Sequence, residues 1–213
     1  MDFNTRWLKD NILERTKESL ESKGYEVFIV ENEVKAKETL LSIIKSGSKV
    51  ACGGSQTLLE CGILDELRSG DYNFLDRYKA GLTDEDIKKI HREAFFSDYY
   101  LTSTNALTEN GELVNLDGLG NRVAAMIYGP ENVIVIAGEN KITRDIDSAY
   151  NRVRNYTAPI NCKRLNKSTP CVRAATCLNC SNEGRICNQM VVTYRQNTPM
   201  RVKVILVKRD LGY

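Results

Sequence analysis

Four cysteines near the C-terminus have a spacing that could bind a metal. Cys171, Cys177, Cys180 and Cys187 follow a C-x5-C-x2-C-x6-C pattern in TPCVRAATCLNCSNEGRICN. Thiolates are soft ligands, and four of them can bind Zn²⁺ tetrahedrally or hold the four irons of a cubane cluster. A zinc clip and a redox centre imply different functions, so the identity of the metal is the main question raised by this segment.

The cysteine spacing matches neither of the common metal-site templates. Zinc sites usually combine two C-x2-C motifs, or one such motif with a histidine pair, and four-iron sites often use C-x2-C-x2-C with a distant cysteine. This chain has a single C-x2-C in the segment and a single histidine, His91. Arg173 and Arg185 could offset the negative charge of a cluster bound by four thiolates. We therefore expect a [4Fe-4S] cluster, with Zn²⁺ or a metal-free dithiol loop as the alternatives.

A Gly-Gly-Ser turn is the first candidate binding region for a small molecule. Gly53, Gly54 and Ser55 separate a short apolar strand, residues 49–52, from a helix expected over residues 56–68. Open α/β sheets bind ligands at the carboxyl ends of their strands, and glycines let the backbone approach a ligand closely. The turn could therefore cradle a phosphate or carboxylate, and an ordinary tight turn is the alternative.

A polar segment over residues 103–122, which includes TENGELVNLDGLGNR, is the second candidate region. Asn and Asp side chains recognise hydroxyl groups, and arginine can bind a carboxylate or phosphate through two hydrogen bonds. A surface hairpin is the alternative. The residues that we expect to bind an anionic small molecule are Gly53, Gly54, Ser55, Thr57, Asn105, Asp117, Asn121, Arg122 and Lys141.

Other reactive side chains have roles that the sequence leaves open. Cys52 ends the strand before the glycine turn and is either a buried core residue or a reactive thiol. Cys162 is a possible substitute metal ligand, but it lies in what reads as the end of a strand or turn, so we do not expect it to bind the metal. Asp117 or Glu109 could act as a general base if the protein were an isomerase or transferase.

Alternating strands and helices predict the scaffold that positions these residues. Apolar residues recur at helical spacing over the first 22 residues, and a later helix is expected from Thr83 and another from Thr143 to about residue 156. Strand character is found at residues 25–30, 49–52, 99–102, 112–115, 133–137 and 201–207. The pattern predicts an α/β fold with a mostly parallel sheet flanked by helices and a C-terminal cysteine loop.

Composition narrows the class of protein. The chain has 213 residues, of which 42% are hydrophobic and 27% charged, and its net charge is +2. This balance is typical of a globular protein and gives no indication of a nucleic-acid or membrane partner. Because we see neither a secretory h-region nor a membrane span, we expect a cytoplasmic protein, in which clustered cysteines more often bind metal than form disulfides.

Several segments together resemble the LUD-domain family, the lactate-utilization proteins, and in particular its cysteine-bearing members. The resemblance is carried by GGSQTLLECG, STNALTENGELVNLDGLGNRVAAMIYGPENVIVIAGENKI, RVRNYTAPIN, the cysteine segment and VKVILVKRDLGY. It implies a fold like that of ribose-5-phosphate isomerase and the CoA-transferases. In relatives of that fold, the glycine turn and the polar loop surround a sugar phosphate or nucleotide.

The resemblance also implies a domain organisation and a function. We expect one domain over residues 1–213, with a helical segment at 1–23 and a metal-binding cysteine loop at 159–190. Family members are linked to oxidation of L-lactate to pyruvate, with electrons passing through iron–sulfur proteins. We therefore expect a redox or substrate-binding component of 2-hydroxy-acid metabolism within an iron–sulfur-dependent oxidoreductase system.

The expected partners are an anionic small molecule, an iron–sulfur redox protein and a second copy of the chain, with no nucleic acid or membrane. Two alternatives stay open. One is a zinc-stapled module that binds a phosphorylated metabolite, and the other is an isomerase or transferase without redox activity.

Overall fold

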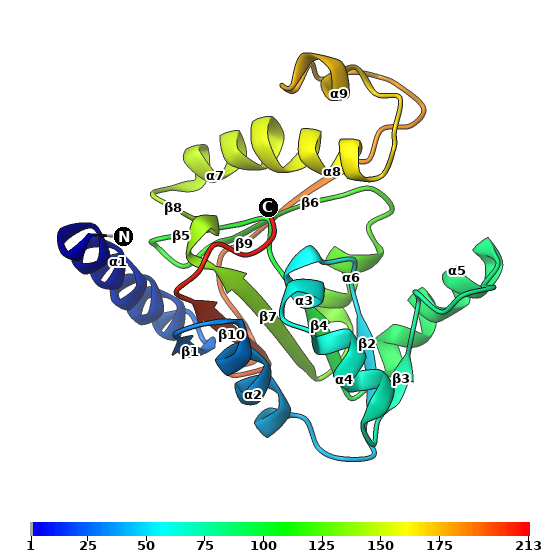
Figure 1. Cartoon of the computed structure of the whole chain (residues 1–213), viewed down its shortest axis with the longest axis horizontal. Coiled ribbons are helices and arrows are strands. Elements are labelled where there is room, and N and C mark those ends of the chain that lie inside the picture. The colour runs from blue at the N-terminus through cyan, green and yellow to red at the C-terminus, as the bar shows by residue number, and fades with distance from the viewer. Residues whose placement is uncertain (1) are drawn as a thin grey trace.

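The computed structural model describes residues 2–213, and within them the strands form two sheets (Figure 1). The larger sheet has six strands in the order β1-β10-β7-β4-β2-β3, and every neighbouring pair is parallel. Its strands are β1 (Glu26–Val30), β2 (Lys49–Cys52), β3 (Asn73–Leu75), β4 (Tyr99–Thr102), β7 (Asn132–Gly138) and β10 (Val202–Val207). The α/β fold with a mostly parallel sheet, predicted from the sequence, is confirmed.

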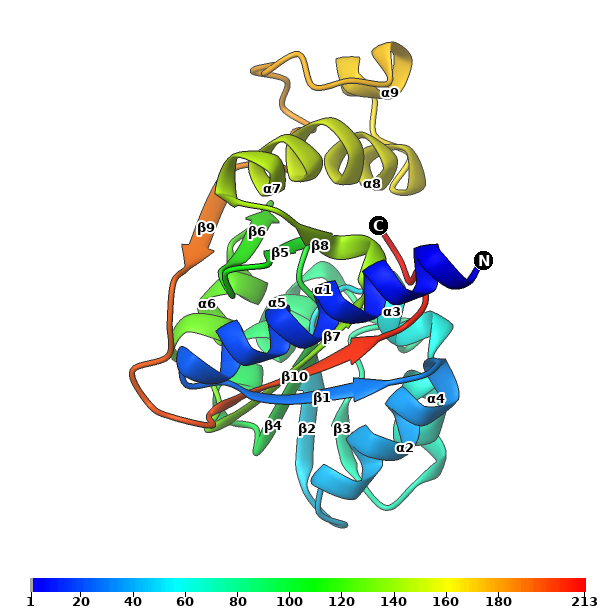
Figure 2. The ribbon, with the colours of Figure 1, turned by 90° about the vertical axis from the view of Figure 1, so that its left-hand side faces the viewer.

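Helices cover both faces of the larger sheet, which explains its continuous apolar strands. Val133 and Val135 of β7 point to one face, and Ile134 and Ile136 point to the other, because side chains alternate along a strand. The first face is covered by α1 (Phe3–Ser22) and α6 (Asn121–Tyr128), and the second by α2 (Glu33–Ile43), α3 (Gln56–Glu60) and α4 (Ile63–Ser69). Figure 2 shows α1 crossing the sheet.

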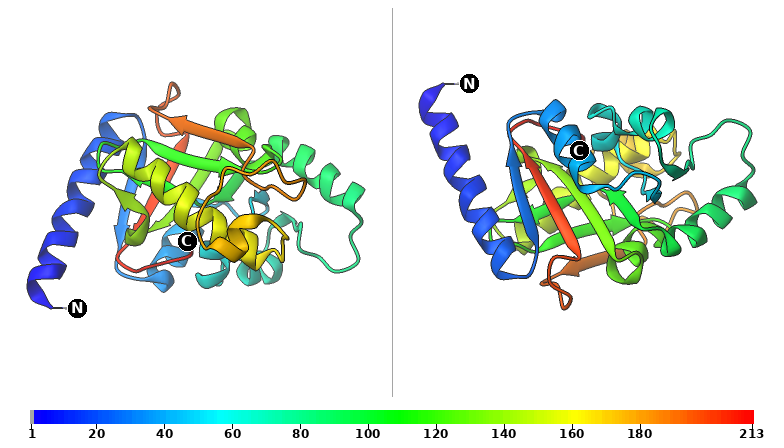
Figure 3. Two further views of the ribbon diagram at one scale, coloured as in Figure 1. Left: turned by 90° about the horizontal axis from the view of Figure 1, so that it is seen from above. Right: turned by 90° about the horizontal axis from the view of Figure 1, so that it is seen from below.

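The expected helix over residues 56–68 is two helices in the structure. Gly62 separates α3 from α4 and has a left-handed backbone with φ 64°. A residue with a side chain rarely adopts this conformation, so the glycine sets the break. The helix expected from Thr83 is α5 (Asp84–Glu93), and Thr83 caps it as predicted. Figure 3 shows α1 and α5 at opposite ends of the molecule.

The smaller sheet packs beside the larger one and is not predicted from the sequence as a separate sheet. It has the order β8-β5-β6-β9, with strands β5 (Ala106–Thr108), β6 (Leu113–Asp117), β8 (Ile142–Thr143) and β9 (Gln189–Thr193). Ala106 and Val114 of this sheet pack against Ala149 of α7 (Ile146–Arg152). The strand expected at residues 112–115 is β6, whereas β8 and β9 are defined by pairing with β5 and β6, from which they are distant in the sequence.

The helix expected from Thr143 differs most from its prediction. Asp145, not Thr143, is the N-cap, and its side chain accepts a hydrogen bond from the backbone N–H of Ser148 at 2.8 Å. Carboxylates cap helices at least as well as hydroxyls, so the cap moves to Asp145.

Helical structure also continues past the expected end near residue 156. A π-helical segment, Val153–Thr157, joins α7 to α8 (Ala158–Arg164). The wider π turn accommodates Pro159, which lacks the N–H that an uninterrupted α-helix would use. Cys162 therefore lies on a helix and not at the end of a strand or turn.

The cysteine segment begins beyond α8 and includes the short helix α9 (Pro170–Ala174). Figures 1 and 2 both place α7 and α8 above the sheets, with α9 and the cysteine segment farther out. Among the helices of residues 2–213, none combines the length and the apolar character needed to cross a bilayer.

Candidate functional site

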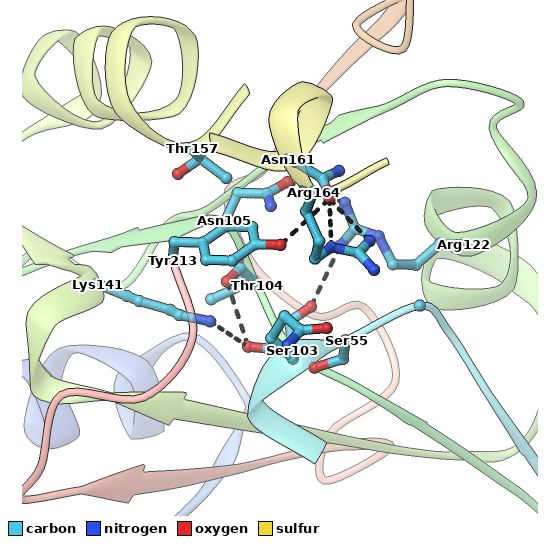
Figure 4. Close-up of a pocket in the computed structure, with 12 residues that line it drawn as sticks. Ser55, Ser103, Thr104, Asn105, Arg122, Lys141, Thr157, Asn161, Arg164 and Tyr213 are labelled. Atoms are coloured by element: carbon cyan, nitrogen blue, oxygen red, sulfur yellow. Dashed lines mark hydrogen bonds between the residues drawn. The ribbon is translucent and has the colours of Figure 1, made fainter. Parts of the chain in front are cut away.

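Loops that follow four strands of the larger sheet meet at one edge and enclose a polar cavity of about 50 Å³ (Figure 4). Ser55 follows β2, Asn105 follows β4, Lys141 follows β7 and Tyr213 follows β10. Ligands of open α/β sheets bind at this carboxyl edge. A second, outer cavity of about 250 Å³ adjoins the first, and the two share Gly54, Asn105, Arg122, Asn161 and Arg164.

The structure brings all nine residues expected to bind an anion to this edge. The inner cavity is lined by Gly54, Ser55, Asn105, Arg122 and Lys141.

The remaining four expected residues lie beside that inner group. Asp117 and Asn121 line the outer cavity. Thr57 accepts a hydrogen bond from Lys141. Gly53 lies against Arg122, since a Cβ at this glycine would be 3.1 Å from the Cγ and Cδ atoms of the arginine. Residues from separate loops therefore converge, although their types alone do not assign each one a role.

Arg122 is buried, and its guanidinium is bonded to the protein rather than open to a ligand. Nη1 donates to Asn115 Oδ1 at 2.6 Å and Nη2 donates to Asn105 Oδ1 at 2.9 Å, and each nitrogen also reaches a backbone carbonyl. Nε lies 3.5 Å from Asp117 Oδ2. The expected bidentate grip on an anion is therefore not available in this structure. Arg122 instead ties the loop after β4 to β6 and shapes the cavity wall.

Lys141 is 2% exposed and faces the inner cavity. Its Nζ donates to Thr57 Oγ1 and to Ser103 Oγ, both at 2.9 Å, and both partners are neutral hydroxyls. Burial, together with the positive charges of Arg152 and Arg122, lowers the pKa of Lys141 to about 7. The amine is therefore present in both its charged and its neutral form near neutral pH.

Helix α8 contributes two cavity residues that the sequence pattern does not predict. Asn161 and Arg164 line both cavities, and Arg164 donates from Nε and Nη2 to Asn161 Oδ1 at 3.1 and 2.8 Å. The guanidinium carries five N–H groups, its two bonds to Asn161 occupy only part of this set, and the side chain is exposed beside Tyr213. Arg164 is thus the arginine that can meet an anion at the cavity mouth.

Further cavity-lining residues are not among the nine expected ligand contacts, although Ser103 and Thr104 lie in the polar segment 103–122. The further residues are Gln56, Ser103, Thr104, Thr157 and Tyr213. Ser103 and Thr104 directly follow β4, so their position at a strand end was a usable signal. Thr157 and Asn161 gave no such signal, because they depend on the helix continuing through its π-helical segment.

Three reactive side chains named in the sequence interpretation are a core thiol, a carboxylate away from both cavities and a carboxylate already paired within the protein. Burial raises the pKa of Cys52 to about 12, so its thiol stays protonated in the core and is not a reactive thiolate. Glu109 pairs with Arg15 of α1 at 2.9 Å and does not line either cavity. Asp117 lines the outer cavity but accepts a hydrogen bond from Gly120 N at 2.9 Å besides its pairing with Arg122.

The four cysteines of the C-terminal segment are half-buried and reduced. Cys177 Sγ accepts hydrogen bonds from Arg154 Nη2 at 3.1 Å and from Asn179 N at 3.4 Å. Burial acts to raise the pKa of Cys177, but these donors outweigh it and the pKa is lowered. In the part of the chain that the structure describes, no three His, Cys, Asp or Glu side chains are gathered closely enough to hold a metal ion.

The end of the cysteine segment forms part of the outer cavity wall. Asn188 donates from its backbone N to Asp117 O at 2.9 Å and from Nδ2 to Gly118 O at 3.1 Å. Ile186 lines the cavity and packs on Gly118, where a Cβ would lie 3.3 Å from Ile186 O. Before the segment begins, Cys162 lies on α8 next to Cys171. Burial raises the pKa of Cys162, and the Cys171 thiol raises it further.

The family model and the first of two solved structures agree with the fold. The model of the LUD domain matches residues 13–207. The crystal structure of a DUF162 family protein from Deinococcus radiodurans has a TM-score of 0.54 and 14% identity, and the match covers 93% of this chain and 98% of that one. The crystal structure of eIF2B delta from Chaetomium thermophilum has a TM-score of 0.38 and 18% identity over 55% of this chain and 50% of that one. No curated protein matches this chain.

Proposed function

This chain belongs to the LUD domain family, and from that premise we propose that it is a lactate-utilization-type protein with two functional parts. The polar cavity binds a small 2-hydroxy acid or the corresponding 2-oxo acid. The cysteine segment holds an iron–sulfur cluster that makes the protein a component of an oxidoreductase system in the cytoplasm.

The size and the polar lining of the inner cavity are the observations that indicate the class of ligand. Its volume of about 50 Å³ corresponds to roughly three or four water-sized positions, which suits a small acid rather than a nucleotide. Lys141 and the free donors of Arg164 approach it with positive charge, and Ser103 and Asn105 supply hydrogen-bonding atoms for a hydroxyl or carbonyl oxygen. A carboxylate with an adjacent oxygen matches this arrangement.

The outer cavity supports a connection between the ligand and the cysteine segment. Ile186 lines it one residue before Cys187, and Asn188 is bonded to the turn at Asp117 and Gly118. A metal centre on this segment would therefore lie beside the route into the inner cavity. This proximity favours a redox role over a structural clip on a remote surface.

The donor set of the cysteine segment suits an iron–sulfur cluster. Cys171, Cys177, Cys180 and Cys187 are thiols on one segment, and Cys177 already accepts N–H···S hydrogen bonds of the kind that stabilise cluster sulfurs. When bound, a four-iron cluster supplies one-electron transfer, so a two-electron oxidation would require an iron–sulfur partner protein. Zn²⁺ is the alternative metal for the same ligands.

Two measurements on the full chain, purified without oxygen, test the proposal. We expect brown protein with iron and acid-labile sulfide in equal amounts, and calorimetric binding of lactate or pyruvate. A colourless protein with one equivalent of zinc would exclude the redox role and favour a zinc-stapled binding module. Binding of a sugar phosphate, with no binding of either acid, would contradict the ligand class.

A further inference from the structure

Lys141 has an environment that a structural lysine would not need. The residue is 2% exposed and lines the inner cavity, and its amine donates hydrogen bonds to the hydroxyls of Thr57 and Ser103. Gly212 closes the opposite side, since a Cβ there would lie 3.3 Å from Lys141 Nζ and 2.7 Å from Thr57 Oγ1. Burying an amine with only neutral partners weakens folding, so stability does not explain a lysine at this position.

The charges around Lys141 favour the neutral, nucleophilic form of the amine. Arg152 and Arg122 are the positive groups that act on it, and Glu60 is the acid whose charge opposes them. Burial is the largest effect, and together these groups bring the pKa of Lys141 to about 7. A lysine that is desolvated and close to other cations is activated as a nucleophile toward carbonyl compounds.

We propose that Lys141 forms an imine with the carbonyl carbon of a small 2-oxo acid held in the inner cavity. Figure 4 shows Lys141 and Arg164 approaching the cavity from different sides. Arg164 has donors available for the carboxylate, while Ser103 both holds the amine and lines the cavity. The ligand class rests on the proposed function, and the covalent step goes beyond it.

The proposed step balances without an oxidant or a reductant. The lone pair of Lys141 Nζ forms a C–N bond to the carbonyl carbon, and the C–O double bond breaks. The carbonyl oxygen leaves as water with the two hydrogens of the neutral amine. The hydroxyls of Thr57 and Ser103 lie at hydrogen-bond distance from Nζ, where they can orient the amine during attack.

Borohydride trapping tests the imine. The full chain is incubated with pyruvate and sodium cyanoborohydride, and the product is analysed by intact mass and peptide mapping. We expect one reduced adduct per chain at Lys141, with a rate that rises as pH increases through about 7 because the neutral amine attacks. Lactate, which has no ketone group, should form no adduct and should slow trapping by competition.

Matched variants and a second carbonyl compound make the outcomes decisive. Lys141→Met should abolish the adduct, whereas Lys163→Met, which changes an exposed lysine on α8, should leave it unchanged. Peptide mapping of the chain without substitutions identifies the lysine that carries the adduct, even if Lys141→Met fails to fold. Labelling spread over surface lysines would overturn the proposal, and so would trapping by glyceraldehyde phosphate but not by pyruvate.

Different experimental results would contradict the proposed imine and the proposed function. If calorimetry shows that pyruvate binds but trapping leaves Lys141 unmodified, the imine is wrong and the ligand class stands. If neither pyruvate nor lactate binds, the proposed function itself is wrong.

Discussion

The polar cavity and the cysteine segment differ in how completely the folded chain fixes their side chains without a ligand or metal. In the cavity, Arg122 and Lys141 are buried and held by hydrogen bonds to fixed neighbours. In the cysteine segment, the thiols are half-buried, and the backbone turns through left-handed residues at Ala175 and Asn179. Within residues 2–213 the metal-ligating side chains are not gathered into a closed set.

This difference has a physical cause. A buried polar group without a partner is costly, so the folded chain must satisfy Arg122 and Lys141 before any ligand arrives. A partly solvated thiol has no such requirement, and the free energy of metal binding can bring thiols together. The comparison indicates a preformed ligand cavity beside a segment whose final arrangement depends on its metal.

The largest effect is expected in the cysteine segment. Cys177→Ser should abolish cluster binding, because it removes one thiolate and the sulfur that accepts from Arg154 and Asn179. Iron and sulfide content with a visible spectrum measures this outcome under anaerobic conditions. Cys61→Ser, at a buried cysteine away from the segment, is the matched control and should keep its iron. Full iron content in Cys177→Ser would show that the ligand assignment is wrong.

The next effect concerns stability in the cavity wall. Arg122→Met should lower the free energy of unfolding by about 3–5 kcal/mol, since it leaves Asp117 and the acceptors of Asn105 and Asn115 without their buried donor. Urea unfolding measures the change. A loss below about 0.5 kcal/mol, the range of ordinary surface substitutions, would contradict the wall-forming role.

Arg164 should behave in the opposite way to Arg122. Arg164→Met is expected to weaken binding of the carboxylate ligand by about 1.5–3 kcal/mol, the range for a hydrogen bond to a charged group. Because this side chain is exposed, the unfolding free energy should change by less than about 0.5 kcal/mol. Calorimetric titration beside urea unfolding separates the two quantities. Unchanged affinity would remove Arg164 from the ligand site.

The last prediction is the pH dependence of stability contributed by Lys141, which accumulates gradually over several pH units. Its pKa falls from 10.5 to about 7 on folding, so between these values the unfolded chain holds a proton that the folded chain lacks. Stability should therefore rise with pH across this window, by at most roughly 1.4 kcal/mol per pH unit, and level off below it. Comparing urea unfolding of the unmodified chain and Lys141→Met at several pH values isolates this contribution. A constant difference would show that Lys141 is protonated in the folded protein throughout.

Much of the scaffold could be predicted because its signals are local. The apolar run VIVIA became the buried strand β7, and Thr83 caps α5 as its hydroxyl predicts. The π-helical segment could not be predicted, because Pro159 reads as a helix terminator unless tertiary contacts hold the wider turn. Because this segment was not predicted, the positions of Thr157 and Asn161 in the cavity wall were not predicted either.

Residue types and spacing alone predicted the α/β fold, the thiol-rich segment and the nine residues that the structure gathers at the carboxyl edge of the sheet. Those properties follow from hydrophobic periodicity and from the rule that parallel strands end at one edge. Tertiary structure decided what each polar group does. Arg122 became part of the wall and Lys141 became a desolvated amine, because the free energy of a charged group depends on burial and on neighbours supplied by distant loops.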